Sequence, residues 1–257
     1  MPNLLIYEQP LSETIRSFLR LENLFRQYHD YINQESGLDS HNAIKTILEI
    51  LSMLSRYDIK RETIKELKRQ SSTLQSFIEI PGINHGKLSE IINQQKDCLQ
   101  RLHGSIGASI GHELQQNELL NAIRQRMSMP GGLCEFDLPV YAHWLHQPVQ
   151  AQLKILNTWF EPFLTLNNSI NLILQVIRDS NDAIDCTAEG GFYQKSIDNH
   201  LTCLMIRVIL PEDSLIFPEI SAGKHRFTIR FLKAGDLTQR PEQSTDNVEF
   251  KLSHCVL

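Results

Sequence analysis

The sequence has few of the features that mark membrane or secreted proteins. Its apolar runs all fall short of the ~20 residues that a membrane helix needs, so we expect no membrane insertion. The stretch from Met1 to Glu8 has no basic residue and ends in a glutamate, which excludes a secretory signal peptide. The 5 cysteines are odd in number and show no repeated spacing. This argues against a disulfide framework and favours the reducing cytoplasm.

Basic residues are fewer than acidic residues. The chain has 25 Lys and Arg against 30 Asp and Glu, a formal net charge of −5. Binding to nucleic acid through overall charge is therefore not expected, and the chain lacks the interleaved aromatic residues on which single-stranded bases stack. A local basic patch is still compatible with this total, because net charge does not report how the charges are distributed.

Sequence signatures of catalysis are missing or incomplete. A glycine-rich stretch begins at Gly104, but a helical pattern precedes it and no Gly-Lys-Ser/Thr follows, so it is predicted to be a connection rather than a phosphate cradle. His143 and His146 lie on adjacent turns of a predicted helix, where Trp and Leu between them supply no base for a zinc-bound water. We expect no enzymatic activity, cofactor or metal. The alternative hypothesis is a cytoplasmic hydrolase or nucleotide-binding enzyme that uses His143, His146 or the Gly104 region.

Hydrophobic periodicity predicts an α+β fold. The 257 residues, 41% hydrophobic, suffice for one large domain or two ordinary ones. Up to residue 180, most apolar residues recur every three or four positions, as in amphipathic helices, whereas 225–232 and 247–254 alternate as strands do. We predict a helical domain and a small antiparallel β-sandwich, which lone strands near Leu5 and Phe136 join. The helical domain comprises 10–128 and 138–180, and the sandwich comprises 1–9, 129–137 and 181–257.

A helix stop in the middle of the chain marks the predicted seam between the two kinds of structure. Pro130 removes a backbone donor, and Gly131 and Gly132 tolerate positive φ at little steric cost. Residues 133–137 then alternate apolar and polar, which is typical of a half-buried strand. We expect at least one of the two glycines to have positive φ, so that valine there damages folding more than any single arginine change.

Basic residues recur within otherwise amphipathic elements. They lie on the first predicted helix, before the glycine corner and in the penultimate strand: Arg16, Arg20, Arg124, Arg126, Lys224, Arg226 and Arg230. The planar guanidinium binds carboxylates bidentately, which suits recognition of an acidic peptide. Scattered surface charge that makes ion pairs of ~0–1 kcal/mol explains the same residues equally well. The residues alone do not decide between these two interpretations.

Several stretches carry a resemblance to one known family. They are Tyr7-Glu8-x-Pro10-Leu11, Ile15-Arg16-x-Phe18-Leu19-Arg20-x-Glu22, Leu74-Gln75-x-Phe77-Ile78, Arg124-Gln125-Arg126-x-Ser128-x-Pro130-Gly131-Gly132, Trp144-Leu145-His146, Gly191-Phe192-Tyr193-Gln194 and Lys224-x-Arg226-Phe227-x-Ile229-Arg230-Phe231. In this order and over nearly the whole chain, they resemble the ZapD family of bacterial cell-division proteins. The likeness is looser over 27–40, over 175–189 and beyond residue 232.

The resemblance implies a two-domain homodimer without enzymatic activity that binds FtsZ directly, through FtsZ's acidic and apolar C-terminal tail. It further implies bundling of FtsZ protofilaments, promotion of Z-ring assembly, a lowered FtsZ GTPase activity and recruitment from the cytoplasm to the midcell division ring. By motif, the implied partner-binding residues are Arg16, Arg20, Lys224, Arg226 and Arg230, with Arg124 and Arg126 nearby. The helical part is the expected dimer surface, because the sandwich uses its apolar strand faces for its own core.

Overall fold

The computed structural model describes residues 4–33, 39–78, 80, 84–104, 110–197, 202–223, 225–233, 235 and 238–257. The chain divides into two units, one of Phe18–Ile173 and one of Met1–Ser17 with Leu174–Leu257, so that the division falls within α1 and within α9. The helices are α1 (Glu13–Ile32), α2 (Ser40–Arg56), α3 (Ile59–Ser76), α4 (His85–Gly104), α5 (His112–Gln115), α6 (Glu118–Arg126), α7 (Pro139–Leu145), α8 (Val149–Phe160), the 3-10 turn η1 (Glu161–Phe163) and α9 (Leu164–Arg178). The strands are β1 (Leu4–Pro10), β2 (Ile184–Ala188), β3 (Phe192–Ser196), β4 (Cys203–Pro211), β5 (Ile216–Ala222), β6 (Arg226–Lys233), β7 (Glu242–Gln243) and β8 (Val248–Val256).

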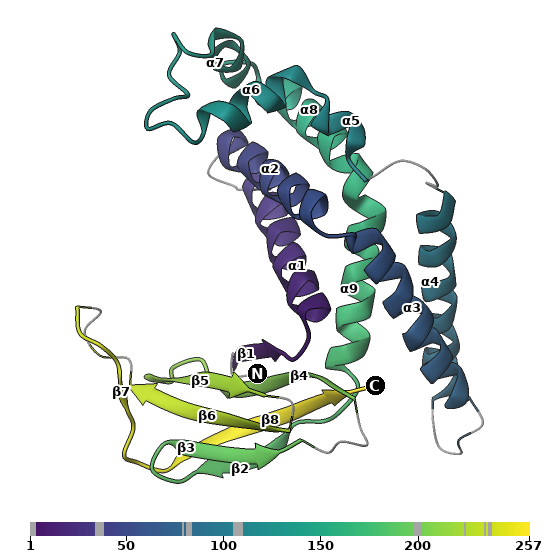
Figure 1. The fold of residues 1–257 in the computed structure, drawn as a ribbon, viewed down its shortest axis with the longest axis vertical. Coiled ribbons are helices and arrows are strands. Elements are labelled where there is room, and N and C mark those ends of the chain that lie inside the picture. Colours follow the sequence, from purple (N-terminus) through teal and green to yellow (C-terminus); the bar gives the residue numbers. More distant parts are fainter. Residues whose placement is uncertain are drawn as a thin grey trace. The chain divides into compact units, whose positions relative to one another are not determined.

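The larger unit, Phe18–Ile173, is helical, and α3 lies beside α4 within it (Figure 1). An aromatic cluster forms part of its core, where the ring of Phe160 stacks on Tyr28 at 4.0 Å between centroids and meets Phe25 and Phe163 edge-on. Gln70 and Gln95 are fully buried in the same unit. Gln95 donates to the Gln70 side chain at 3.1 Å, and Gln70 donates to the Ile173 carbonyl at 3.3 Å. These bonds join α3, α4 and α9.

The first two helices begin at side-chain caps. Ser12 accepts a hydrogen bond from the backbone N–H of Ile15 at 3.2 Å and caps α1. Asp39 caps α2, because its carboxylate accepts from the Asn42 N–H at 3.1 Å, and Ser40 is the first residue of that helix.

The smaller unit is a sandwich of two antiparallel sheets. One sheet has the strand order β1-β4-β8-β2, and the other has the order β3-β6-β5 with β7 paired to β6. Their facing sides form one buried core, to which β4, β6 and β8 each contribute alternate residues: Ile206, Val208, Leu210, Phe227, Ile229, Phe231, Val248, Phe250 and Leu252. The α+β fold predicted from the sequence is confirmed.

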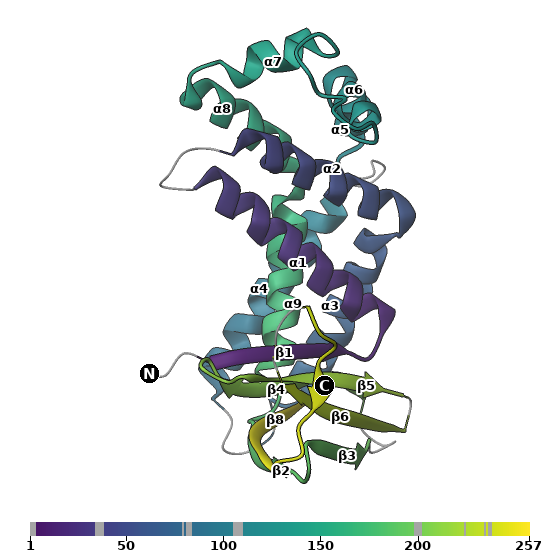
Figure 2. The same ribbon diagram turned by 90° about the vertical axis from the view of Figure 1, so that its left-hand side faces the viewer.

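The N-terminal strand joins the sandwich as predicted. β1 pairs with β4 in one unbroken register, from Leu4 opposite Pro211 to Pro10 opposite Met205 (Figure 2). Within the same unit, the Glu8 carboxylate accepts hydrogen bonds from Arg178 on both oxygens at 2.8 Å and from Nε of Arg207 at 3.0 Å. A partly buried three-residue ion cluster therefore holds β1 to β4 and to the end of α9.

The predicted central strand at 133–137 is wrong. These residues form consecutive turns within the helical unit, where the N–H groups of Cys134 and Asp137 donate to the carbonyls of Gly131 and Cys134. Backbone groups used in turns are not available for strand pairing, and Phe136, expected on a buried face, is 82% exposed. Five alternating residues were too few to distinguish a strand from a turn-rich segment.

Candidate functional site

The basic residues singled out in the sequence lie as pairs on separate elements. Arg16 and Arg20 are one turn apart on α1, a spacing that puts their side chains on one face of the helix. Arg124 and Arg126 end α6, but residues two apart on a helix point in different directions. Lys224 lies outside the described residues. The structure thus groups these residues within elements, and a single patch that joins the elements stays a proposal.

Arg226 and Arg230 share the outer face of β6. Phe227, Ile229 and Phe231 are fully buried, while Arg226 and Arg230 are exposed on the opposite side, as the alternation predicts. At about 3.3 Å per residue their Cα atoms are roughly 13 Å apart. Arg230 forms an ion pair with Glu219 of the neighbouring strand β5. Among the residues that the structure describes, Arg226 has no side-chain partner.

The ion pairs made by these arginines are weak enough to exchange. Nε of Arg16 lies 3.7 Å from the Glu13 carboxylate, and the two side chains are 43% and 58% exposed. Arg230 and Glu219 are each 53% exposed. Pairs this accessible contribute ~0–1 kcal/mol, so an acidic partner can replace the internal carboxylate at little cost. Arg124 instead donates to the Asn121 side chain at 2.8 Å, a neutral acceptor.

The two histidines of the alternative hypothesis make local hydrogen bonds on α7 and its end. Nδ1 of His146 lies 2.7 Å from the Ala142 carbonyl oxygen, and Nε2 of His143 lies 2.9 Å from the Gln147 amide nitrogen. Within the described part of the chain, no three His, Cys, Asp or Glu side chains are arranged to hold a metal ion. The glycine-rich stretch after Gly104 lies largely outside the described residues. No observation favours this hypothesis.

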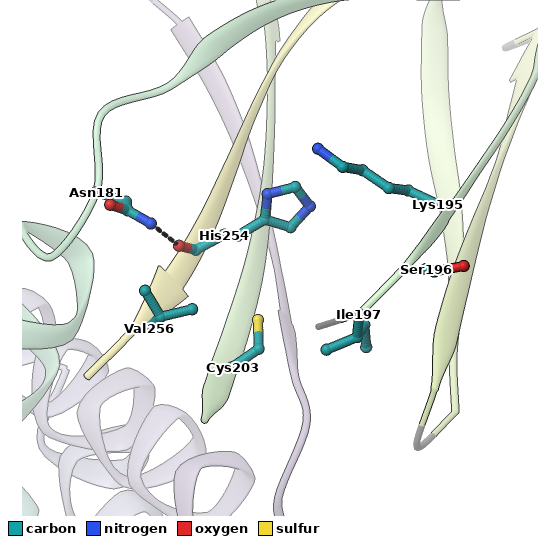
Figure 3. Close-up of a pocket in the computed structure, with 7 residues that line it drawn as sticks. All are labelled: Asn181, Lys195, Ser196, Ile197, Cys203, His254 and Val256. Atoms are coloured by element: carbon teal, nitrogen blue, oxygen red, sulfur yellow. Dashed lines mark hydrogen bonds between the residues drawn. The ribbon is translucent and has the colours of Figure 1, made fainter. Parts of the chain in front are cut away.

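A pocket of about 210 Å³ opens in the sandwich unit, and no sequence pattern predicts it. It is lined by residues of β3, β4 and β8 with the segments next to them: Asn181, Lys195, Ser196, Ile197, Cys203, His254 and Val256 (Figure 3). Burial raises the pKa of the Cys203 thiol to about 11, so the sulfur is protonated at neutral pH and is a poor nucleophile. The Cys203 thiol is therefore not activated for nucleophilic chemistry.

His254 is neutral in the folded protein at pH 7. Its pKa is lowered, first by burial and then by the positive charge of Lys195. Its Nε2 is buried and has no hydrogen-bond partner among the described residues, while Asn181 donates to its backbone carbonyl at 2.8 Å. Lys195 therefore supplies the positive charge of the pocket.

Acidification is expected to destabilise the sandwich through His254. The unfolded chain, with the ordinary histidine pKa of 6.5, takes up the proton before the folded protein does. The contribution of His254 to stability is therefore fully present above pH 6.5. It is lost as the pH falls from 6.5 toward the lowered pKa of the folded state. The melting temperature between about pH 7.5 and about pH 5.5 should fall less in His254→Gln than in the parent. Equal falls would assign the pH dependence to other groups.

Within the described residues, no helix combines the length and the apolar character that a membrane span requires.

Comparison with protein families matches residues 19–230 to the ZapD model, described as "Cell division protein". A protein named "Cell division protein ZapD" from Methylococcus capsulatus is 39% identical over 257 residues, covering 100% of both chains. Proteins of the same name from Coxiella burnetii and Azoarcus sp. are 37% and 36% identical, covering 97% and 98% of this chain and 96% and 99% of theirs.

Proposed function

Because the chain belongs to the ZapD family of cell division proteins, which gives it a role in cell division, we propose that it binds FtsZ directly. It attaches to FtsZ's C-terminal tail, bundles protofilaments, promotes Z-ring assembly and lowers FtsZ's GTPase activity. It does so without enzymatic activity of its own, in the cytoplasm and at the midcell ring. The relatives are named for cell division and not for a reaction, which supports this proposal.

The observation that carries the proposal is a set of exposed arginines on α1 and β6 in a chain with a net negative charge. Overall charge does not draw an acidic tail to such a protein, so local cations must do so. Arg16 and Arg230 make only exposed ion pairs, and Arg20 and Arg226 lie at the surface. Each of these guanidinium groups can bind a carboxylate bidentately. Arg124 and Arg126, with Lys224, complete the proposed set.

Bundling requires at least two tail-binding sites in one particle, which a homodimer provides. A monomer with one site decorates a filament but does not join two. Once one site is occupied, the second contact is effectively intramolecular, so modest affinity at each site gives much greater avidity. We place the dimer surface on the helical unit, because the sandwich buries its apolar strand faces in its own core.

The test of the proposed function is co-sedimentation of the protein with FtsZ filaments, with and without the FtsZ tail. The protein should enter the pellet with intact filaments, increase light scattering and lower GTP turnover, and it should stay in the supernatant with tailless filaments. Equal sedimentation with both kinds of filament would place the contact elsewhere on FtsZ. Absence of binding to either would refute the proposed function.

Charge reversal at the proposed site is expected to weaken binding without affecting folding. Arg16→Glu, Arg20→Glu and Arg226→Glu should each lower the affinity for a tail peptide by about tenfold at low salt, because attraction becomes repulsion. The effect should shrink as salt rises, since exposed charges are screened over ~8–10 Å near physiological ionic strength.

The matched control is Lys68→Glu, an equal change of charge at an exposed position of α3 outside the proposed set. Its affinity and salt dependence should match those of the parent, and all four variants should melt within a few degrees of it. If the arginine reversals bind normally at low salt, the site is misassigned. If Lys68→Glu weakens binding as much as they do, the effect is one of net charge alone.

A further inference from the structure

The pocket of the sandwich lies where the ends of three strands meet. Lys195 extends from β3 toward the imidazole of His254 on β8, and the Cys203 sulfur on β4 points into the space between Val256 and Ile197 (Figure 3). Cys203, Ile197 and Val256 are each only half-buried. The pocket thus has an apolar wall that the sandwich's own core leaves uncovered.

Among the described residues that line the pocket, charge has one sign. Lys195 is exposed and positively charged, His254 is neutral at pH 7, and none of the described residues that line the pocket is acidic. Lys195 lies directly opposite the buried Phe227 on β6, so it is on the inner face of the sheet. Arg226 lies opposite Ser196 and is on the outer face. Lys195 is therefore the cation on the side of the pocket.

The volume of the pocket limits what it accommodates. Pockets for cofactors and drug-sized ligands measure about 300–1,000 Å³, so a pocket of about 210 Å³ is small for such a molecule. It has room for one side chain. An aliphatic side chain fits the apolar wall, and a neighbouring carboxylate on the same segment fits Lys195 at the rim.

We propose that this pocket receives one aliphatic side chain of an acidic peptide segment, one of whose carboxylates pairs with Lys195. The inference rests on the proposed function and deepens it, since the segment is the acidic and apolar tail of the filament partner. Exposed arginines alone attract any acidic tail. The pocket adds selection for an aliphatic residue next to the acidic ones, because burying that residue removes apolar surface from water.

The test is a double-mutant comparison with a synthetic peptide of the FtsZ C-terminal tail and the full-length protein. Cys203→Phe places a ring in the pocket, whereas the matched variant Cys203→Ala leaves the pocket open. Burial of one aliphatic side chain strengthens binding by about tenfold or more, so Cys203→Phe should lose that factor and Cys203→Ala should not. The aliphatic residues of the peptide are then replaced one by one with alanine. At one position, this replacement should lower the affinity of the parent protein about tenfold and leave the affinity of Cys203→Phe unchanged.

A second variant covers the case in which Cys203→Phe fails to fold. Lys195→Glu changes an exposed residue at the rim. It should weaken binding of the unmodified tail peptide about tenfold. The effect should be smaller for a peptide in which Asp and Glu are replaced by Asn and Gln. If both pocket variants bind like the parent while Arg226→Glu does not, the pocket inference is wrong and the proposed function stands. If the parent itself binds neither peptide nor filaments, the proposed function has failed as well.

Discussion

Glu8→Ala is expected to lower the free energy of unfolding of the sandwich unit by about 3 kcal/mol. Glu8 lies between Arg178 and Arg207, and the three side chains are only 17%, 25% and 16% exposed. Removing the carboxylate takes away the negative charge that the two largely buried guanidinium groups share. The expected loss lies at the lower end of the about 3–5 kcal/mol seen for buried pairs, because some solvent reaches the cluster. Urea unfolding followed by circular dichroism measures it.

The chain offers a matched control for this prediction in Glu219→Ala. Glu219 also pairs with an arginine, Arg230, but both side chains are 53% exposed. Its loss should cost less than about 1 kcal/mol, because water replaces the carboxylate. Glu8→Gln, which keeps an acceptor oxygen without the charge, should lie between the two. If Glu8→Ala is as mild as Glu219→Ala, the cluster does not stabilise the sandwich and serves only to fix the register of β1 on β4.

This cluster illustrates what sequence reasoning does not reach. Glu8 and Arg207 are 199 residues apart, and Glu8 and Arg178 are 170 apart. The sequence shows each residue only as one charge within a strand or helix pattern. Their proximity follows from the pairing of β1 with β4, and strand pairing is a long-range property without a local signal. The pocket was missed for the same reason, since Lys195 and His254 meet only once the two sheets are assembled.

Local periodicity did predict the elements that carry the basic residues. The spacing of Phe18, Leu21, Phe25 and Tyr28 defines the buried face of α1, and all four side chains are buried. The alternation in β6 placed Arg226 and Arg230 on the outer face, where they lie. Both patterns extend over eight residues or more and end at clear boundaries. What the patterns left open was which of these arginines has an acidic neighbour, because Glu219 belongs to a different strand.

The glycine corner shows where a local pattern is right about a residue and wrong about the structure around it. The strand expected after Gly132 does not exist, yet the backbone favours glycine at both positions. Gly131 has a φ of +68°, as predicted for at least one of them, and an added Cβ there would meet only the Cys134 sulfur at 4.0 Å. At Gly132 the reason is different, because backbone and side-chain atoms of Arg126 and Met129 lie too close to leave room for a Cβ.

Gly132→Ala is expected to lower the free energy of unfolding of the helical unit by about 2–3 kcal/mol. A Cβ at this position would lie 2.5 Å from the Arg126 carbonyl oxygen and 2.9 Å from the Met129 Cβ. That carbonyl accepts the Met129 N–H at 2.9 Å, and the Met129 carbonyl accepts the Gly132 N–H at 3.0 Å, so the added methyl group pushes on two hydrogen-bonded turns. Gly132→Val, with two further carbon atoms, should cost more.

Two other glycines separate this steric effect from other consequences of adding a Cβ. Gly131→Ala should cost about 1 kcal/mol, because the added Cβ meets only the Cys134 sulfur at 4.0 Å but the residue has an unfavourable φ. Gly104→Ala, at the end of α4 with no atom within 4 Å of the added Cβ, should be neutral or slightly stabilising. Thermal unfolding of the three variants should therefore rank Gly132→Ala lowest, then Gly131→Ala, then Gly104→Ala. A Gly132→Ala protein that melts with the parent would show that the turns after α6 relax around the methyl group, and that close packing at this corner is not what selects glycine.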